Sequence, residues 1–260
     1  MNDLSEIPGV LACDIGNSTI KFAHVNGDEI GDVTSCRVGE LTRLGRILTT
    51  LWEPLPAPKA LVAASVNPAA CKALEAAASH SLQAGILVIG RDLPLPIDTD
   101  LPHPEAVGAD RLCAAVAAFD QLGQACVVAD FGTAITIDCV NEQGIFLGGA
   151  ILPGLAMSAD ALHDKAAQLP RVDPAASASL PGKDTTEAIQ IGLLAAARGA
   201  LRECIEAFAK QLGHWPLVIC TGGDADLIVG DPQHNDLVQA IVPDLALRGV
   251  AMAYYRSLVK

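Results

Sequence analysis

The same short pattern occurs twice in the chain: an apolar run ends on an aspartate and continues into a glycine-containing turn. The first copy, LACDIGNST, places Asp14 before Gly16, and the second, VVADFGTA, places Asp130 before Gly132. The two aspartates are 116 residues apart. A repeat at that distance indicates a duplicated domain rather than a short solenoid repeat.

Hydrophobic periodicity predicts a similar element order in both halves, namely three strands, a helix, a strand and a helix. In the first half we expect strands at 9–14, 18–25, 29–37, 60–66 and 85–90, and helices at 39–52, 68–82 and 108–122. In the second half we expect strands at 125–130, 134–140, 145–151 and near 239–242, and helices at about 155–168, at 184–212 and at 243–258. Residues 216–228 are expected to form a strand, a Gly-Gly turn and the start of a helix. NGD at 26–28 predicts a tight hairpin turn. The sequence thus predicts an α/β protein with domains 1–124 and 125–260.

Composition excludes several classes of function. With 17 basic against 30 acidic residues and a net charge of -13, the chain lacks the clustered cations that a broad nucleic-acid or anionic-membrane surface needs. Its apolar stretches are too short to span a bilayer, and the acidic N-terminus does not resemble a signal peptide. The eight cysteines form no CxxC pair. Buried reduced thiols in a cytoplasmic protein are therefore favoured over a zinc or disulfide framework.

The two Asp-x-Gly turns suggest anion binding. Glycine lets a ligand approach the backbone closely, and outward N–H groups can bind phosphate oxygens. The aspartates would repel a phosphate unless a cation, Mg²⁺ or a monovalent ion, lies beside them. An ordinary hairpin turn is the alternative for either copy, but two copies at matching positions favour a nucleotide site. TGG at 221–223 could be a third contact or simply a tight turn, and the chain contains no P-loop motif.

A further candidate lies at the start of the predicted helix 108–122, in the sequence GADR. Asp110 is readily explained as a helix N-terminal residue, whereas Arg111 in the first turn opposes the helix dipole. A carboxylate that accepts a hydroxyl proton and a guanidinium that binds an anionic substrate group would explain both residues.

Six segments together resemble the type III pantothenate kinase family, which includes Bvg accessory factor-like proteins. They are DIGNSTIK (14–21), GADR (108–111), DFGTAITID (130–138), GGAILPGL (148–155), GKDTTEA (182–188) and TGG (221–223). The resemblance implies a duplicated, ribonuclease H-like fold of the acetate and sugar kinase/Hsp70/actin superfamily, with an actin-like ATPase domain in each half and an interdomain cleft. It also implies a homodimer that uses ATP to phosphorylate pantothenate to 4′-phosphopantothenate, the first step of coenzyme A synthesis, and that needs Mg²⁺ and a monovalent cation, K⁺ or NH₄⁺.

The same resemblance assigns roles to individual residues. Asp110 matches the catalytic base, and Asp130 matches the monovalent-cation ligand. The ATP-binding positions are Asp14, Ile15, Gly16, Asn17, Ser18, Thr19, Ile20, Lys21 and Thr133. The pantothenate-binding positions are Gly108, Ala109, Asp110, Arg111 and Thr185. One position departs from the family: a Tyr that often precedes the GADR-like motif by seven residues is Leu101 here, so that substrate contact is replaced or lost.

The predicted helix 184–212 is apolar nearly all round in its middle, and Gly192, Ala196 and Gly199 form a stripe of small residues. This pattern favours a symmetric dimer in which the helix meets its copy, with a core helix inside one subunit as the alternative. Two other functions remain open on the sequence: a non-catalytic, actin-like nucleotide-binding regulatory protein, and a phosphatase of the same fold. Asp110 and Arg111 together favour the kinase.

Overall fold

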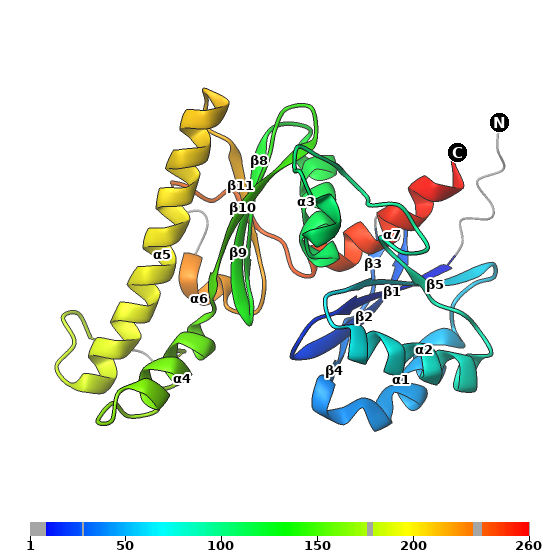
Figure 1. The fold of residues 1–260 in the computed structure, drawn as a ribbon, viewed down its shortest axis with the longest axis horizontal. Helices are drawn as coiled ribbons and strands as arrows, with labels where there is room; N and C mark the ends of the chain where they lie inside the picture. Colours follow the sequence, from blue (N-terminus) through cyan, green and yellow to red (C-terminus); the bar gives the residue numbers. More distant parts are fainter. Residues whose placement is uncertain (1–8, 28, 176–178, 231–235, 260) are drawn as a thin grey trace. The chain divides into compact units, whose positions relative to one another are not determined.

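The computed structural model describes residues 9–27, 29–175, 179–230 and 236–259, which form two compact units. Unit 1 joins the chain up to Gln121 to a C-terminal segment that begins at Asp244, and unit 2 comprises Leu122–Pro243. Each unit consists of a mixed β-sheet with helices packed on it (Figure 1).

The sheet of unit 1 is built around strand β1. Its strands are β1 (Gly9–Ile15), β2 (Thr19–Asn26), β3 (Glu29–Ile30), β4 (Thr34–Arg37), β5 (Lys59–Ser65) and β6 (Leu87–Val88). The order is β3-β2-β1-β5-β6, and β4 also pairs with β2. Strand β2 runs antiparallel to β1, whereas β5 is parallel to β1, and β6 is parallel to β5.

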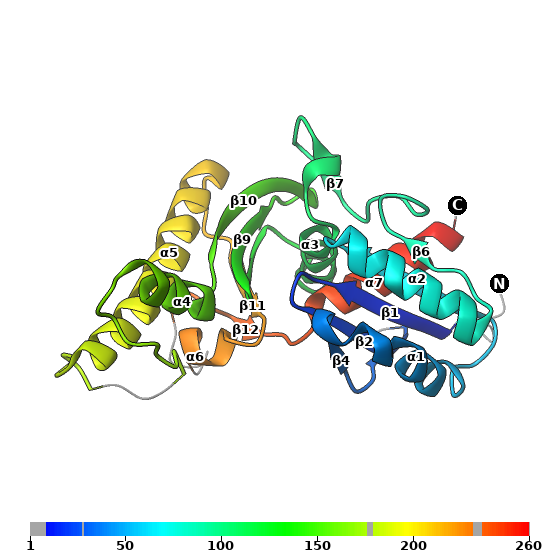
Figure 2. The ribbon, with the colours of Figure 1, turned by 60° about the horizontal axis from the view of Figure 1, so that its bottom comes forward.

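Helices cover both faces of this sheet (Figure 2). Helices α1 (Leu44–Trp52) and α2 (Pro68–Leu82) pack against the β1 side chains Leu11, Cys13 and Ile15. Helices α3 (Ala109–Leu122) and α7 (Leu245–Leu258) pack against the opposite face, which carries Val10 and Ala12. Because side chains alternate along a strand, Asp14 belongs to the α3 and α7 face. The short elements η2 (Val38–Arg43), β7 (Asp98–Thr99) and η3 (Pro104–Ala106) lie in the connections.

Unit 2 repeats this plan. Its strands are β8 (Cys126–Phe131), β9 (Ala134–Val140), β10 (Ile145–Pro153), β11 (Leu217–Thr221) and β12 (Ala240–Ile241), and its helices are α4 (Leu155–Lys165), α5 (Thr185–Leu212) and α6 (Ala225–Val229). The strands follow the order β12-β11-β8-β9-β10. One apolar core joins alternate residues of β8, β9 and β11 to α4, α5 and α6.

Corresponding strands have the same neighbours and directions in both sheets. The first strand of each half lies between an antiparallel second strand and a parallel strand that the chain reaches through helices. This confirms the predicted duplication. It also means that Asp14 and Asp130 occupy the same position, at or next to the C-terminal end of the central strand of each sheet.

Several predictions differ from the structure. Of the predicted strand 85–90, only Leu87–Val88 form a strand, β6. Residues 29–37 form two short strands, β3 and β4, which both pair with β2. The predicted helix 39–52 begins as the 3₁₀-helix η2, which is interrupted at Glu40 by non-helical backbone angles. The sequence places segment 243–258 in the second domain, whereas α7 belongs to unit 1, because its apolar residues cover that sheet. Asp28, in the predicted hairpin turn, lies outside the described residues, although β2 and β3 pair on either side of it.

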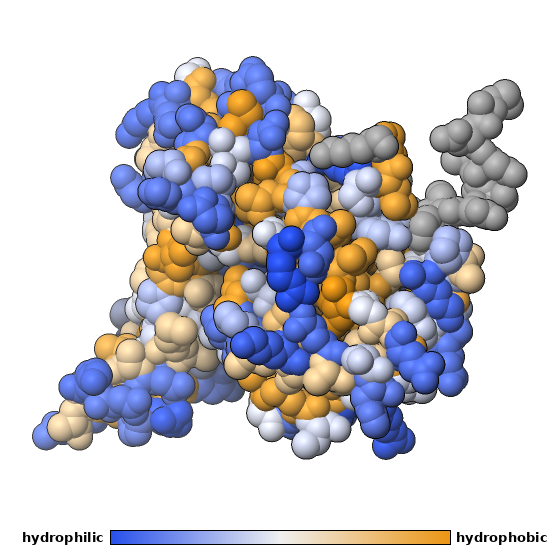
Figure 3. All heavy atoms as spheres, turned by 45° about the vertical axis from the view of Figure 1, so that its right-hand side comes forward, coloured by the Kyte–Doolittle hydropathy of each residue, from blue (hydrophilic) through white to orange (hydrophobic). Residues whose placement is uncertain are grey.

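Hydrophilic and hydrophobic residues are interspersed over the face drawn in Figure 3. Among the described residues, none of the helices combines the length and the apolar character needed to cross a membrane. All eight cysteines lie in described parts of the chain and carry free thiols, seven of them buried. The expectation that the cysteines are buried is confirmed for those seven.

Candidate active site

The first candidate turn connects β1 to β2. Asp14 lies directly opposite Lys21 in the antiparallel ladder, so both side chains project from the same face of the sheet. The N–H of Gly16 donates to the carbonyl of Thr19 at 3.0 Å and closes the turn. Asn17 and Ser18, at the tip, are exposed. The strands thus hold a tight, accessible backbone turn beside an aspartate and a lysine.

The GADR segment begins α3 on the same face of unit 1. A side-chain oxygen of Asp110 accepts a hydrogen bond from the N–H of Arg111 at 2.8 Å, which fixes the carboxylate beside the helix start. A Cβ atom at Gly108 would lie 2.4 Å from Oδ1 of Asp110 and 3.1 Å from Cγ1 of Val66. Glycine at 108 therefore leaves the space that the Asp110 carboxylate occupies.

Burial raises the pKa of Asp110 above its ordinary value, although the Arg111 N–H and the Arg111 charge oppose the shift. Burial is the main cause of the raised pKa of the Cys113 thiol, and the negative charges of Asp14 and Asp110 raise this pKa further. Both carboxylates therefore lie near the first turns of α3. A carboxylate whose pKa is raised is better suited to accept a proton than an exposed one with an ordinary pKa.

The second candidate turn follows β8 in unit 2. Asp130 lies opposite Thr136 on β9 and opposite Thr221 on β11, so a carboxylate is flanked by two hydroxyl side chains. Gly222 has a φ of +95°. A Cβ atom there would lie 2.5 Å from Oδ1 of Asp130 and 2.4 Å from the Phe131 carbonyl. The TGG turn, a weak signal in the sequence, thus packs directly against the Asp130 carboxylate.

Backbone hydrogen bonds from the N-terminal ends of two helices position the turn that follows Asp130. The N–H of Gly154, before α4, donates to the Thr133 carbonyl at 3.1 Å, and the N–H of Asp224, before α6, donates to the Phe131 carbonyl at 3.0 Å. A Cβ atom at Gly154 would lie 2.2 Å from the Gly132 carbonyl oxygen. Thr133 itself is exposed. Gly222 belongs to the TGG segment that the sequence offers as a possible third contact, whereas no individual role was predicted for Gly154. The position of each glycine between a strand and a helix is the signal that the sequence carries.

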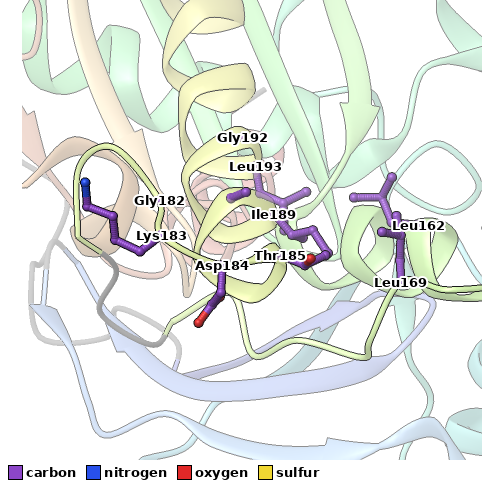
Figure 4. A pocket seen from close by; sticks show the side chains of 10 residues that line it. Leu162, Leu169, Gly182, Lys183, Asp184, Thr185, Ile189, Gly192 and Leu193 are labelled. Atoms are coloured by element: carbon purple, nitrogen blue, oxygen red, sulfur yellow. The ribbon is translucent and has the colours of Figure 1, made fainter.

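Thr185 lies apart from that turn within unit 2, at the start of α5. Asp184 caps the helix by accepting the Glu187 N–H at 2.9 Å. Beside it lies a pocket of about 630 Å³. Figure 4 shows Leu162 and Leu169 on one side of this pocket, facing Thr185 and Ile189 on α5. The exposed Thr185 hydroxyl is therefore at the edge of an apolar hollow.

The donor atoms suit hard cations rather than zinc. Within the described part of the chain, no three His, Cys, Asp or Glu side chains cluster closely enough to hold a metal ion. Around Asp130 the side chains on the neighbouring strands are threonines, so the available donors are oxygen atoms, which Mg²⁺ and K⁺ prefer. A cation there would need further oxygen ligands from the backbone, water or phosphate.

Unit 1 therefore brings Asp14–Lys21 together with Gly108–Arg111, and unit 2 places Asp130 and Thr133 on one turn and Thr185 on α5. Leu101 is half-buried in the connection between β7 and η3. Two sheets whose central strands have corresponding neighbours, each with an Asp-x-Gly turn after its central strand, define a duplicated fold.

Solved structures share this fold. A Baf family protein from Campylobacter jejuni superposes with a TM-score of 0.59 at 21% identity, covering 97% of this chain and 100% of that one. A glucokinase from an Antarctic psychrotroph gives a TM-score of 0.51 at 14% identity, covering 96% of this chain and all of the other. Porphyromonas gingivalis acetate kinase gives 0.50 at 12% identity, covering 97% of this chain and 99% of the other. The protein thus has the acetate and sugar kinase/Hsp70/actin fold.

Sequence similarity is more specific than the fold. Residues 10–207 match the family model described as type III pantothenate kinase. The type III pantothenate kinase of Syntrophotalea carbinolica is 32% identical over 261 residues, and that of Moorella thermoacetica is 34% identical over 255 residues; each alignment covers 95% of this chain and 99% of the relative. The chain belongs to the type III pantothenate kinase family.

Proposed function

We propose that this chain transfers the γ-phosphoryl group of ATP to the hydroxyl group of pantothenate, giving ADP and 4′-phosphopantothenate at the first step of coenzyme A synthesis. Family membership over nearly the whole chain supports this activity. The observation that carries the mechanism is the Asp110 carboxylate, whose pKa is raised by burial and which Gly108 and the Arg111 N–H hold in place. Incubation with ATP, Mg²⁺, K⁺ and pantothenate should yield both products in equal amounts.

In the reaction, the hydroxyl oxygen of pantothenate forms a bond to the γ-phosphorus, while the bond from that phosphorus to the bridging oxygen breaks and releases ADP. Asp110 orients the hydroxyl group and accepts its proton. Arg111 binds the pantothenate carboxylate, since a guanidinium matches the geometry of that group. Phosphoryl transfer needs alignment and charge neutralisation more than covalent participation by the protein. These two adjacent residues supply the proton acceptor and the substrate anchor.

We assign ATP binding to the two turns, with residues Asp14–Lys21 in unit 1 and Thr133 in unit 2, so that each unit contributes one actin-like ATPase half. The backbone N–H groups of such turns suit phosphate oxygens. Asp14 would hold Mg²⁺, directly or through water, and Asp130 would hold K⁺ or NH₄⁺. Bound there, these cations would offset phosphate charge. A cytoplasmic location is consistent with the family and with the reduced cysteines.

The assignment of a monovalent cation to Asp130 predicts that activity depends on K⁺ or NH₄⁺. A carboxylate at a strand end beside two threonines is stabilised when an ion neutralises it. In wild type, replacing Na⁺ by K⁺ should raise both the rate and the melting temperature, because a ligand that binds only the folded state stabilises it. In Asp130→Asn the K⁺-dependent rise in melting temperature should disappear. Full activity in a buffer containing only Na⁺ or Tris would contradict the assignment.

We also propose a homodimer in which α5 packs against its copy. One face of α5 packs on the core of unit 2 through Ile189, Leu193, Ala197, Leu201 and Ile205. Its other face exposes small residues: Ala188, Gly192, Ala195, Ala196 and Gly199. A Cβ atom at Gly192 or Gly199 would meet nothing among the described residues within 4 Å. An exposed face of this kind lets a second helix approach closely, and it extends to Thr185.

The rival function is a non-catalytic, actin-like nucleotide-binding regulator, which would bind ATP and leave pantothenate unchanged. The position of Asp110 and Arg111 favours the kinase, because a regulator has no need of a buried carboxylate with a raised pKa beside a guanidinium. A phosphatase of this fold would release inorganic phosphate instead of phosphopantothenate. The product analysis described above separates the three.

A further inference from the structure

An ion pair joins the first turn to the far end of the chain. Nζ of Lys21 lies 2.8 Å from Oδ1 of Asp244, although the two residues are 223 positions apart in sequence. The Lys21 side chain is 37% exposed and that of Asp244 is 21% exposed, so the pair is partly shielded from solvent. Both residues belong to unit 1. Because Lys21 is opposite Asp14, the pair lies beside the candidate phosphate turn.

The conformation of Asp244 shows that its carboxylate is not used as a helix cap. Asp244 immediately precedes α7, a position where aspartate side chains commonly accept a hydrogen bond from the helix backbone. Here it makes no such bond, and its backbone is left-handed with φ 52° and ψ 38°. That conformation is uncommon for a residue other than glycine and is sustained only when the surroundings enforce it. The carboxylate is instead directed to Lys21.

Helix α7 gives Asp244 a firm support. Leu247 and Val250 are buried against the β1 and β2 side chains Val10 and Ala23. A Cβ atom at Gly249 would lie 1.9 Å from the Cys113 carbonyl oxygen, so α7 and α3 are in close backbone contact. Asp244 is thus attached to the same packed layer that carries the GADR segment at the start of α3.

We propose that Asp244 is a positioning residue for Lys21 in ATP binding. This inference rests on the proposed function, in which Lys21 belongs to the phosphate-binding segment. A lysine side chain has four flexible methylene groups and a compact charge with three N–H donors, and the bond to Asp244 uses one of them. The ion pair holds the ammonium group in one place before the nucleotide binds. Binding then loses less conformational entropy in the Lys21 side chain, which favours a higher affinity.

The test is a double-mutant cycle on nucleotide affinity, measured by equilibrium titration with a non-hydrolysable ATP analogue. We expect Asp244→Ala to raise the Kd by about fivefold, the scale of a partly exposed ion pair with a good geometry. Lys21→Met should raise the Kd at least as much. Asp244→Ala should then have almost no further effect in the Lys21→Met background, because residues that act as one unit are not additive. Steady-state kinetics should show the change in KM for ATP rather than in kcat.

A merely structural role for Asp244 gives a different result. In that case Asp244→Ala would lower the melting temperature and change the Kd equally in both backgrounds, which would overturn the inference. Asp120→Ala is the matched control, because it removes the aspartate of another ion pair of unit 1, with Arg256 at 3.1 Å, and should leave the Kd unchanged. The titration does not require turnover. Failure of wild type to phosphorylate pantothenate would therefore reject the proposed function separately.

Discussion

Asp110→Asn should lower kcat by about 10²-fold or more while leaving the affinity for ATP nearly unchanged, because a positioned proton acceptor contributes on that scale. Asparagine has the same size as aspartate, so it fits the space that Gly108 leaves. Steady-state rates and nucleotide titration measure the two quantities. Asp120→Asn is the control, since it makes the same change at an exposed position of the same helix.

The raised pKa of Asp110 adds two further expectations. First, kcat/KM should fall as pH decreases through this pKa, because the base must be ionised. Second, the folded state holds the Asp110 proton more tightly than the unfolded state, so this residue's contribution to stability is present at low pH and is lost as pH rises through the folded pKa. At neutral pH, Asp110→Asn should therefore raise the melting temperature while it lowers kcat. Near-normal turnover in this variant would remove Asp110 from the mechanism.

Gly192→Glu should abolish both dimerisation and activity. The exposed face of α5 has room for a side chain in the single subunit, so the variant should fold, but a charge there cannot be buried against a second helix without a large desolvation cost. We further propose that, in this dimer, Thr185 at the start of α5 lies at the edge of the partner's pantothenate site, so loss of the dimer would separate the two. Light scattering gives the mass, and phosphopantothenate formation gives the activity.

Gly85→Glu provides the matched control, because Gly85 is also exposed and also has nothing near its Cβ position among the described residues. It should remain a dimer with normal activity. A folded Gly192→Glu monomer with full activity would contradict the proposed assembly, as would a wild-type protein that is monomeric under assay conditions.

Local sequence patterns, such as helix caps and hydrophobic periodicity, were sufficient to predict much of this fold. The helix α2 begins at Pro68, as predicted, because proline suits the first helical position and Asn67 caps it by accepting the Ala70 N–H. Strand β9, Ala134–Val140, has the predicted bounds, in a segment rich in β-branched residues. The duplicated Asp-x-Gly turns then placed two candidate site residues, Asp14 and Asp130, at matching positions in the two sheets.

Features that depend on long-range packing could not be predicted in this way. The return of α7 to unit 1 depends on which sheet its apolar face covers, and the amphipathic pattern of a helix is the same for either sheet. The contact between Gly222 and Asp130 and the ion pair between Lys21 and Asp244 join segments that are far apart in sequence. Nothing in the local pattern around any of these residues specifies the partner.

The central claim is that this chain phosphorylates pantothenate, and direct product analysis tests it best. Purified protein would be incubated with ATP, Mg²⁺, K⁺ and pantothenate, and ADP, inorganic phosphate and 4′-phosphopantothenate would be quantified by chromatography and mass spectrometry. The account predicts ADP and 4′-phosphopantothenate in equal amounts, with little inorganic phosphate and with formation of both products slowed about 10²-fold or more in Asp110→Asn. ATP binding without phosphopantothenate, or ADP accompanied by inorganic phosphate alone, would contradict it.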